Sequence, residues 1–154
     1  MSEITEVMTV RKAVNEDLPR IVEMGRRFLL EGPYHDQLKD NPDKALEFAF
    51  AVMNKMGGRI LVSEGDHGVN GVFAFTVSPH VLSGELTAME LIWYVEPEAR
   101  AGGIALQLLA EAEKWARESG VELFQLTAPS EEVGNLYRYC GGYKKIEVTY
   151  QRKL

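Results

Sequence analysis

Hydrophobic and polar positions alternate along this chain in a way that predicts a mixture of strands and helices. Apolar runs of strand length cover residues 8–14, 59–63, 69–77, 85–95, 121–127 and 143–151. Apolar residues recur at helical spacing after Asn15, after Asn41, from Gly102 to Ser119 and from Ser130 to about Cys140. The predicted order is strand, two helices, three strands, helix, strand, helix and strand.

Turn and capping residues set the limits of these elements. Asn41 before Pro42 predicts a helix start, and the glycine pairs 57–58 and 141–142 predict helix ends. The polar turn 64–68 joins two apolar runs as an antiparallel hairpin, and residues 85–95 extend it to a meander. Strand 121–127 follows a crossover helix, so we expect it parallel to 85–95. A mixed α/β sheet with helices on both faces results.

Composition narrows the class of protein. With 154 residues, 45% of them hydrophobic, we expect one domain spanning 1–154. A net charge of −6 without a basic run argues against a nucleic-acid partner; an acidic surface suits a cationic acceptor and equally serves solubility. One cysteine, no export signal and no long apolar stretch favour a cytoplasmic protein without a membrane anchor. Three scattered histidines predict no metal.

The most informative stretch is a strand that passes through Arg100-Ala101-Gly102-Gly103-Ile104-Ala105 into a helix. The first turn of a helix presents unpaired N–H groups and partial positive charge, and glycine lets a phosphate approach them closely. We therefore expect a ligand that carries a pyrophosphate. The alternative is that both glycines only make a tight turn. The loop matches neither a P-loop nor a G-x-G-x-x-G fingerprint.

The same residues resemble a known family. Arg-x-x-Gly-x-Ala at 100–105 is similar to the acyl-CoA-binding motif [QR]-x-x-G-x-[GA] of the GNAT N-acetyltransferase superfamily, and the preceding Val95-Glu96-Pro97-Glu98-Ala99-Arg100 resembles its V-x-P-E-x-R run. The resemblance implies a central, mostly antiparallel sheet of six to seven strands in which the parallel pair 85–95 and 121–127 splays apart. It also implies transfer of an acyl group from acetyl-CoA to a primary amine of a small molecule or peptide by direct attack.

The resemblance assigns the cofactor-binding residues. The backbone of Trp93, Tyr94 and Val95 would receive the pantetheine arm as an added strand, and one amide would polarise the thioester carbonyl. The pyrophosphate and the rest of the donor would lie against Arg100, Ala101, Gly102, Gly103, Ile104, Ala105 and Asn135.

Glu90 is the candidate general base. It lies within an otherwise apolar strand, and burial there raises the pKa of a carboxylate. An amine arrives as an ammonium and must lose a proton before it attacks, and the resemblance gives this task to Glu90, directly or through a water. The alternatives are an edge or bulge position that faces solvent, or an ion pair with Arg59 or Lys145.

Tyr137 is the candidate general acid. The segment 135–143 resembles the family ending N-x-x-A-x-x-[LF]-Y-x-x-x-G-[FY], whose tyrosine protonates the departing CoA thiolate. This chain departs from that pattern, because Gly142 is an additional glycine and the upstream N-x-x-A spacing is missing. Tyr139 is therefore an alternative, although it lies about 200° around the helix from Tyr137.

Other functions stay open. The first is a non-catalytic acyl-CoA-binding sensor or interaction module on the same fold. The second is transfer of a different acyl group, or transfer to a nucleobase or tRNA amine. Loops 34–36 and 78–80 lie where relatives read the acceptor, although loop polarity alone explains their composition. A homodimer through the C-terminal strand is a further expectation.

Overall fold

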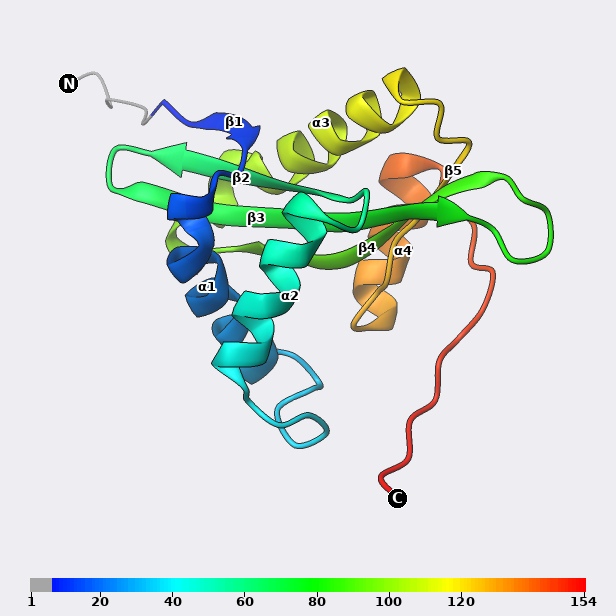
Figure 1. Ribbon diagram of the computed structural model, residues 1–154, viewed down its shortest axis with the longest axis horizontal. Coiled ribbons are helices and arrows are strands. Elements are labelled where there is room, and N and C mark those ends of the chain that lie inside the picture. Colours follow the sequence, from blue (N-terminus) through cyan, green and yellow to red (C-terminus); the bar gives the residue numbers. More distant parts are fainter. Residues whose placement is uncertain (1–6) are drawn as a thin grey trace.

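A central sheet organises the computed structural model, which describes residues 7–154 (Figure 1). Within those residues the sheet has five strands in sequence order: β1 (Thr9–Lys12), β2 (Arg59–Gly65), β3 (Gly68–Pro79), β4 (Leu86–Val95) and β5 (Leu123–Gln125). The first four are antiparallel neighbours, and β5 runs parallel to β4. The predicted mixed sheet is confirmed, but the expected six to seven strands are five.

The missing strand is the predicted one at 143–151, which forms neither helix nor strand and pairs with no described strand. Gly142, with φ of 69°, ends the preceding helix in the left-handed conformation. The N–H of Tyr143 then donates to the carbonyl of Tyr137, and the chain runs away from the sheet (Figure 1). The alternating pattern of this segment is that of a strand, but it meets no strand edge.

Helices cover both faces of the sheet. The helices α1 (Leu18–Glu31) and α2 (Pro42–Asn54) pack on one face, and α3 (Ile104–Glu118) packs on the other. The last helix, α4 (Glu131–Gly141), follows β5 (Figure 1). The predicted caps are present, because Asn41 accepts from the N–H of Lys44 and Ser130 accepts from that of Val133. Short 3₁₀ turns, η1 (Asn15–Asp17) and η2 (Pro97–Gly102), precede α1 and α3.

Two apolar clusters form the core, one on each face of the sheet. The cluster under α1 and α2 includes Met24, Val52 and Val72, which are fully or almost fully buried. The cluster under α3 is built around Phe73 and Phe75, whose rings lie 5.9 Å apart. Strands buried on both faces explain the long apolar runs in the sequence.

A β-bulge in β4 decides which way its side chains point. Ala74 of β3 pairs with Ile92, but the next residue, Phe75, pairs with Glu90, so Leu91 is the additional residue. Leu91 and Ile92 both pack on the α1 face, and the alternation beyond them is shifted by one residue. The bulge therefore places Glu90 on the α3 face, which is also the face of Trp93.

None of the described helices is both long and apolar enough to cross a membrane.

Candidate active site

The Glu90 carboxylate lies at the point where β4 and β5 separate. The last paired residues of the two strands are Met89 and Gln125. One residue further along β4, the Glu90 carboxylate accepts a hydrogen bond of 2.8 Å from the backbone N–H of Thr127. The Glu90 side chain thus takes the place of the next backbone hydrogen bond between β4 and β5. The predicted splay of the parallel pair begins here.

Burial gives this carboxylate an unusual proton affinity. Glu90 is only 8% exposed, and desolvation raises its pKa from 4.5 to about 7, although the Thr127 N–H acts in the opposite direction. Arg59 lies over the ring of Trp115 instead, 4.3 Å from its centre. Among the described residues, Lys145 forms no hydrogen bond or ion pair with Glu90 either. Glu90 therefore has neither the solvent exposure nor the ion pair of the alternative interpretations.

Tyr137 shares a backbone neighbour with Glu90. Its hydroxyl donates to the Thr127 carbonyl at 3.1 Å, so both side chains hold the same residue. Its ring stacks on that of Trp93, with centroids 5.8 Å apart. Desolvation, followed by the charge of Glu90, raises the pKa of Tyr137 well above 10, so the phenol keeps its proton at neutral pH.

Two other tyrosines bear on the site, because Tyr139 was the alternative general acid and Tyr34 belongs to the loop 34–36 that was expected near the acceptor. Tyr139 is 87% exposed, so its side chain lies mostly in solvent. Tyr34, in the loop after α1, is close enough for the charge of Glu90 to raise its pKa, in addition to a larger effect of desolvation. Its ring packs against Phe28, with centroids 5.4 Å apart. The structure therefore brings Tyr34 to the region of Glu90, and leaves Tyr139 outside it.

The indole of Trp93 carries an unusual donor. Its Nε1 is buried and has no hydrogen-bond partner within residues 7–154. Buried donors are normally paired, so this N–H needs a water or a ligand atom.

The glycine loop opens onto free space above the start of α3. Gly103, with φ of 74°, is the N-cap residue, and no side chain caps the first turn. No atom lies within 4 Å of the position that a Cβ would occupy on Gly102 or Gly103. This open space leaves room for an anion beside the first turn of α3, and binding of a pyrophosphate there stays a prediction.

Arg100 makes contacts that the sequence did not predict. Its Nε donates to the Val95 carbonyl at 2.8 Å, and its Nη2 lies 2.7 Å from Glu31 at the end of α1. The guanidinium also lies over the Tyr94 ring at 5.3 Å, and the Tyr94 hydroxyl donates to Glu31. Arg100 thus ties the glycine loop to β4 and α1. Asn135 accepts a hydrogen bond from Arg138 on its own helix.

A second ion-pair cluster anchors the same loop. Glu96, directly after β4, is completely buried and contacts Arg20 at 3.1 Å and Arg27 at 2.6 Å, both on α1. Arg20 also donates to the carbonyl of Val69 in β3. The connection from β4 to α3 is therefore fixed on α1 before the glycines begin.

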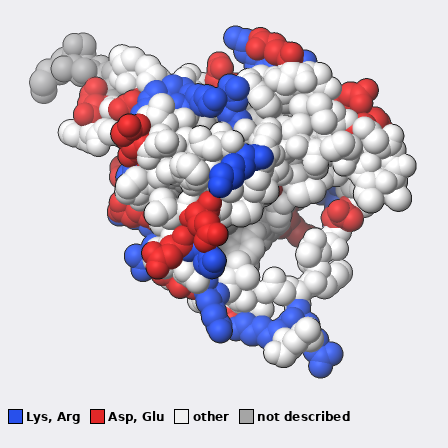
Figure 2. Space-filling view, in the orientation of Figure 1, with Lys and Arg blue, Asp and Glu red and all other residues white. Residues whose placement is uncertain are grey.

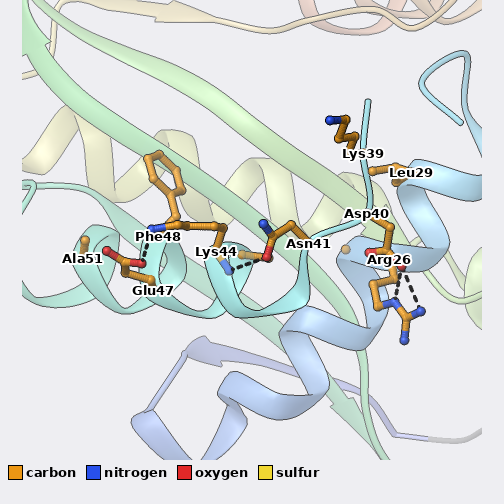
Figure 3. Close-up of a pocket in the computed structure, with 11 residues that line it drawn as sticks. Arg26, Leu29, Lys39, Asp40, Asn41, Lys44, Glu47, Phe48 and Ala51 are labelled. Atoms are coloured by element: carbon orange, nitrogen blue, oxygen red, sulfur yellow. Dashed lines mark hydrogen bonds and ion pairs between the residues drawn. The ribbon is translucent and has the colours of Figure 1, made fainter. Parts of the chain in front are cut away.

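A pocket lies away from Glu90. Its volume is about 570 Å³, and it lies between α1 and α2 (Figure 3). Its walls include the ion pair of Arg26 with Asp40 and the exposed Lys44, which contacts Glu47. None of the residues around Glu90 lines this pocket, so we place the candidate site at the splay. No described group of three or more His, Cys, Asp or Glu residues has the arrangement of a metal site.

The structure combines a parallel strand pair that separates, a buried carboxylate at the separation and a glycine loop before α3, which is the arrangement that the sequence resemblance implied. A model of the acetyltransferase (GNAT) family matches residues 23–141, and the chain belongs to this family. Its members use acetyl-CoA as a co-substrate without a metal, which agrees with the predicted donor. No curated protein matches the sequence.

Solved structures share the fold at low sequence identity. A transcriptional regulator from Bacillus halodurans C-125 has a TM-score of 0.79 at 20% identity, covering 96% of this chain and all of that one. A predicted acetyltransferase with acetyl-CoA from Clostridium acetobutylicum has a TM-score of 0.76 at 18% identity, covering 95% and 96%. The aminoglycoside N-acetyltransferase AAC(6')-Iy in complex with CoA has a TM-score of 0.75 at 16% identity, covering 99% of both.

Proposed function

We propose that this chain is an acetyl-CoA-dependent N-acetyltransferase in which a primary amine attacks the thioester directly. The observation that carries this proposal is the buried Glu90 carboxylate at the splay between β4 and β5. Its pKa is about 7. A base with that pKa is about half deprotonated at neutral pH, where general-base catalysis is most effective. The acceptor is a small molecule or a peptide that carries a primary amine.

Glu90 and Tyr137 carry the proton transfers of this reaction. Glu90 accepts the proton that the ammonium loses, directly or through a water, and the amine nitrogen forms a bond to the thioester carbon. The carbon–sulfur bond then breaks, and Tyr137 supplies a proton to the CoA sulfur. The raised pKa of Tyr137 suits it to this task because it arrives protonated. The nitrogen loses a second proton as it becomes an amide, and this proton passes to the Tyr137 phenolate, directly or through solvent. Glu90 returns its own proton to solvent, so both groups regain their starting states.

The donor lies along the opening between the strands. The uncapped first turn of α3 and the open space over Gly102 and Gly103 support binding of the pyrophosphate there. The backbone of β4 from Trp93 to Val95 has no partner in β5, which supports binding of the pantetheine arm as an added strand. The unpaired indole N–H of Trp93 adds a donor for a carbonyl of that arm. Arg100 acts by holding the loop in place.

A pair of substitutions at Gly102 tests donor binding. Gly102 has room for a side chain and no left-handed φ, so replacement does not strain the backbone. We expect Gly102→Trp to abolish acetyl-CoA binding in calorimetry because the indole fills the phosphate space, while Gly102→Ala binds almost normally. Equal affinity in the two variants would remove the pyrophosphate from this loop.

Catalysis is tested by release of CoA thiol from acetyl-CoA with a panel of primary amines. Activity that depends on Glu90 and Tyr137 supports the enzyme. A second candidate function is a non-catalytic acyl-CoA sensor, because one solved structure with this fold is described as a transcriptional regulator. Tight acetyl-CoA binding without thiol release with any amine would favour the sensor.

A further inference from the structure

Arg59 is a partly buried cation whose charge no described residue compensates. It begins β2, and its guanidinium stacks on the indole ring of Trp115 in α3, 4.3 Å from the ring centre. Within residues 7–154 its side chain forms no hydrogen bond and no ion pair. Burial lowers the pKa of Arg59, and no described carboxylate acts in the opposite direction. Charged groups that lose contact with water are normally paired, so this guanidinium is suited to an anion that the described residues do not provide.

Stacking on Trp115 orients the guanidinium but leaves its hydrogen-bond donors unused. A ring contact involves the face of the planar group, whereas the N–H donors lie along its edge. Trp115 is itself held in place, because its ring packs on that of Phe75 with centroids 5.4 Å apart. The guanidinium edge is thus fixed on a packed support. Such an edge offers two parallel N–H groups, which match the two oxygens of a carboxylate or phosphate group.

A pocket opens beside this guanidinium, between strands β1 and β2 and helix α3. Its volume is about 260 Å³, and both Arg59 and Trp115 line it. Val10 and Leu61 provide apolar wall. The other lining residues are charged: Arg11, Lys12, Glu111, Lys114 and Glu118. Figure 2 shows basic side chains gathered over the end of β1 and the adjoining part of α3.

The charges around the pocket leave a small excess of positive charge for a ligand. Arg11 is already paired, because two carboxylates contact it at 2.7 and 2.8 Å. The remaining lining cations form no ion pair with a described residue: Lys12, Arg59 and Lys114. The carboxylates of Glu111 and Glu118 also line the pocket, and both residues are exposed. Three cations against two carboxylates leave one positive charge, on a chain whose net charge is −6.

We propose that this pocket binds a small organic carboxylate through Arg59. The two carboxylate oxygens accept from the guanidinium edge, and the apolar body of the ligand lies against Val10 and Leu61. A single excess positive charge favours one carboxylate over a phosphate dianion, which the two glutamates would repel more strongly. The pocket is separate from the candidate active site, because α3 rises about 18 Å between Gly103 and Trp115. The proposal therefore does not depend on the acyl-transfer reaction.

Titration of the ¹⁵N-labelled protein with benzoate, followed by NMR, tests this site. The chain has two tryptophans, so the indole N–H signals of Trp115 and Trp93 report separately on the pocket and on the candidate active site. We expect benzoate to shift the Trp115 signal in a saturable manner and to leave the Trp93 signal in place. Benzamide, its neutral analogue, should bind at least tenfold more weakly, and phenyl phosphate should also bind more weakly. No saturable shift of Trp115, an equal response to benzamide or tighter binding of phenyl phosphate would overturn the proposal.

Single substitutions test whether the guanidinium is the binding group. Arg59→Gln should weaken benzoate binding at least tenfold, and Arg59→Lys severalfold, because lysine keeps the charge but not the two parallel donors. Arg117→Gln is the matched control, since Arg117 lies on α3 outside the pocket and pairs with Glu113. Lys12 is exposed, so Lys12→Glu should keep the fold and weaken binding about threefold. Full affinity in Arg59→Gln, or an equal loss in Arg117→Gln, would refute the role of Arg59. If Arg59→Gln does not fold, full affinity in Lys12→Glu has the same meaning.

Discussion

Glu90 should make the folded protein less stable as the pH rises, and Glu90→Gln should remove that effect. The folded-state pKa is about 7 and the ordinary value is 4.5. Below pH 4.5 the carboxyl is neutral in both states and has no effect on stability. Between pH 4.5 and 7 the unfolded chain releases its proton first, so folding loses free energy, and the loss is complete above pH 7.

The magnitude follows from those two values. At roughly 1.4 kcal/mol for each pKa unit, a carboxylate at position 90 costs the folded state about 3 kcal/mol above pH 7. The amide of Gln is neutral throughout, and its oxygen still accepts from the Thr127 N–H. Its NH₂ group needs a new partner, which costs about 1 kcal/mol at every pH. The variant should therefore be slightly less stable than the parent at pH 4.5 and more stable at pH 8.5.

Urea unfolding at a series of pH values between 4.5 and 8.5 measures this difference. The stability of the variant relative to the parent should change by about 3 kcal/mol across the range, and thermal midpoints should shift by about 6–10 °C. Glu122→Gln is the control, because that carboxylate is exposed next to β5. A difference that stays constant with pH would refute the reasoning that Glu90 is charged and desolvated in the folded protein.

Three further predictions concern the residues around the splay. Glu96→Gln should lower the free energy of unfolding by about 2 kcal/mol and raise the KM for acetyl-CoA, because Arg20 and Arg27 lose the buried carboxylate that fixes the loop. If both quantities stay unchanged, Glu96 does not have that role. Tyr137→Phe should reduce kcat about 100-fold, whereas Tyr139→Phe, at an exposed position, should leave kcat intact; equal rates would exclude Tyr137 as the acid. Gly103→Ala should destabilise the protein by about 1 kcal/mol because φ there is 74°, and Gly102→Ala should be nearly neutral in the same unfolding assay; the reverse order would contradict the left-handed cap.

Local signals in the sequence predicted most of the fold. Helix starts are signalled locally, by N-cap residues such as Asn41 and Ser130 and by the glycine loop before α3. The helices that these signals predicted are present. The strand predicted at 143–151 was wrong for a physical reason. Alternation specifies which face of a segment is apolar, but it does not supply the neighbouring strand that makes the hydrogen bonds.

The candidate site was predictable only in part. Glu90 is visible in the sequence because a carboxylate interrupts an apolar run. Its contact with Thr127 uses a backbone N–H that no side-chain pattern reveals. The same limit applies to Arg100, whose partner Glu31 is 69 residues away in the chain. An acidic residue directly after a buried strand, as Glu96 is, indicates that the carboxylate is paired. Its partners Arg20 and Arg27 belong to no sequence motif, so they could not be predicted.

Because of the bulge at Leu91, the number of residues in β4, and not their side chains, decides which face of the sheet Glu90 lies on. In a strand without this additional residue, the carboxylate would project to the α1 face, among aliphatic side chains. An alanine scan of β4 would therefore miss the feature that aims the carboxylate, because every replacement keeps the number of residues. Related chains should tolerate many substitutions in this strand while tolerating neither the gain nor the loss of a single position within it.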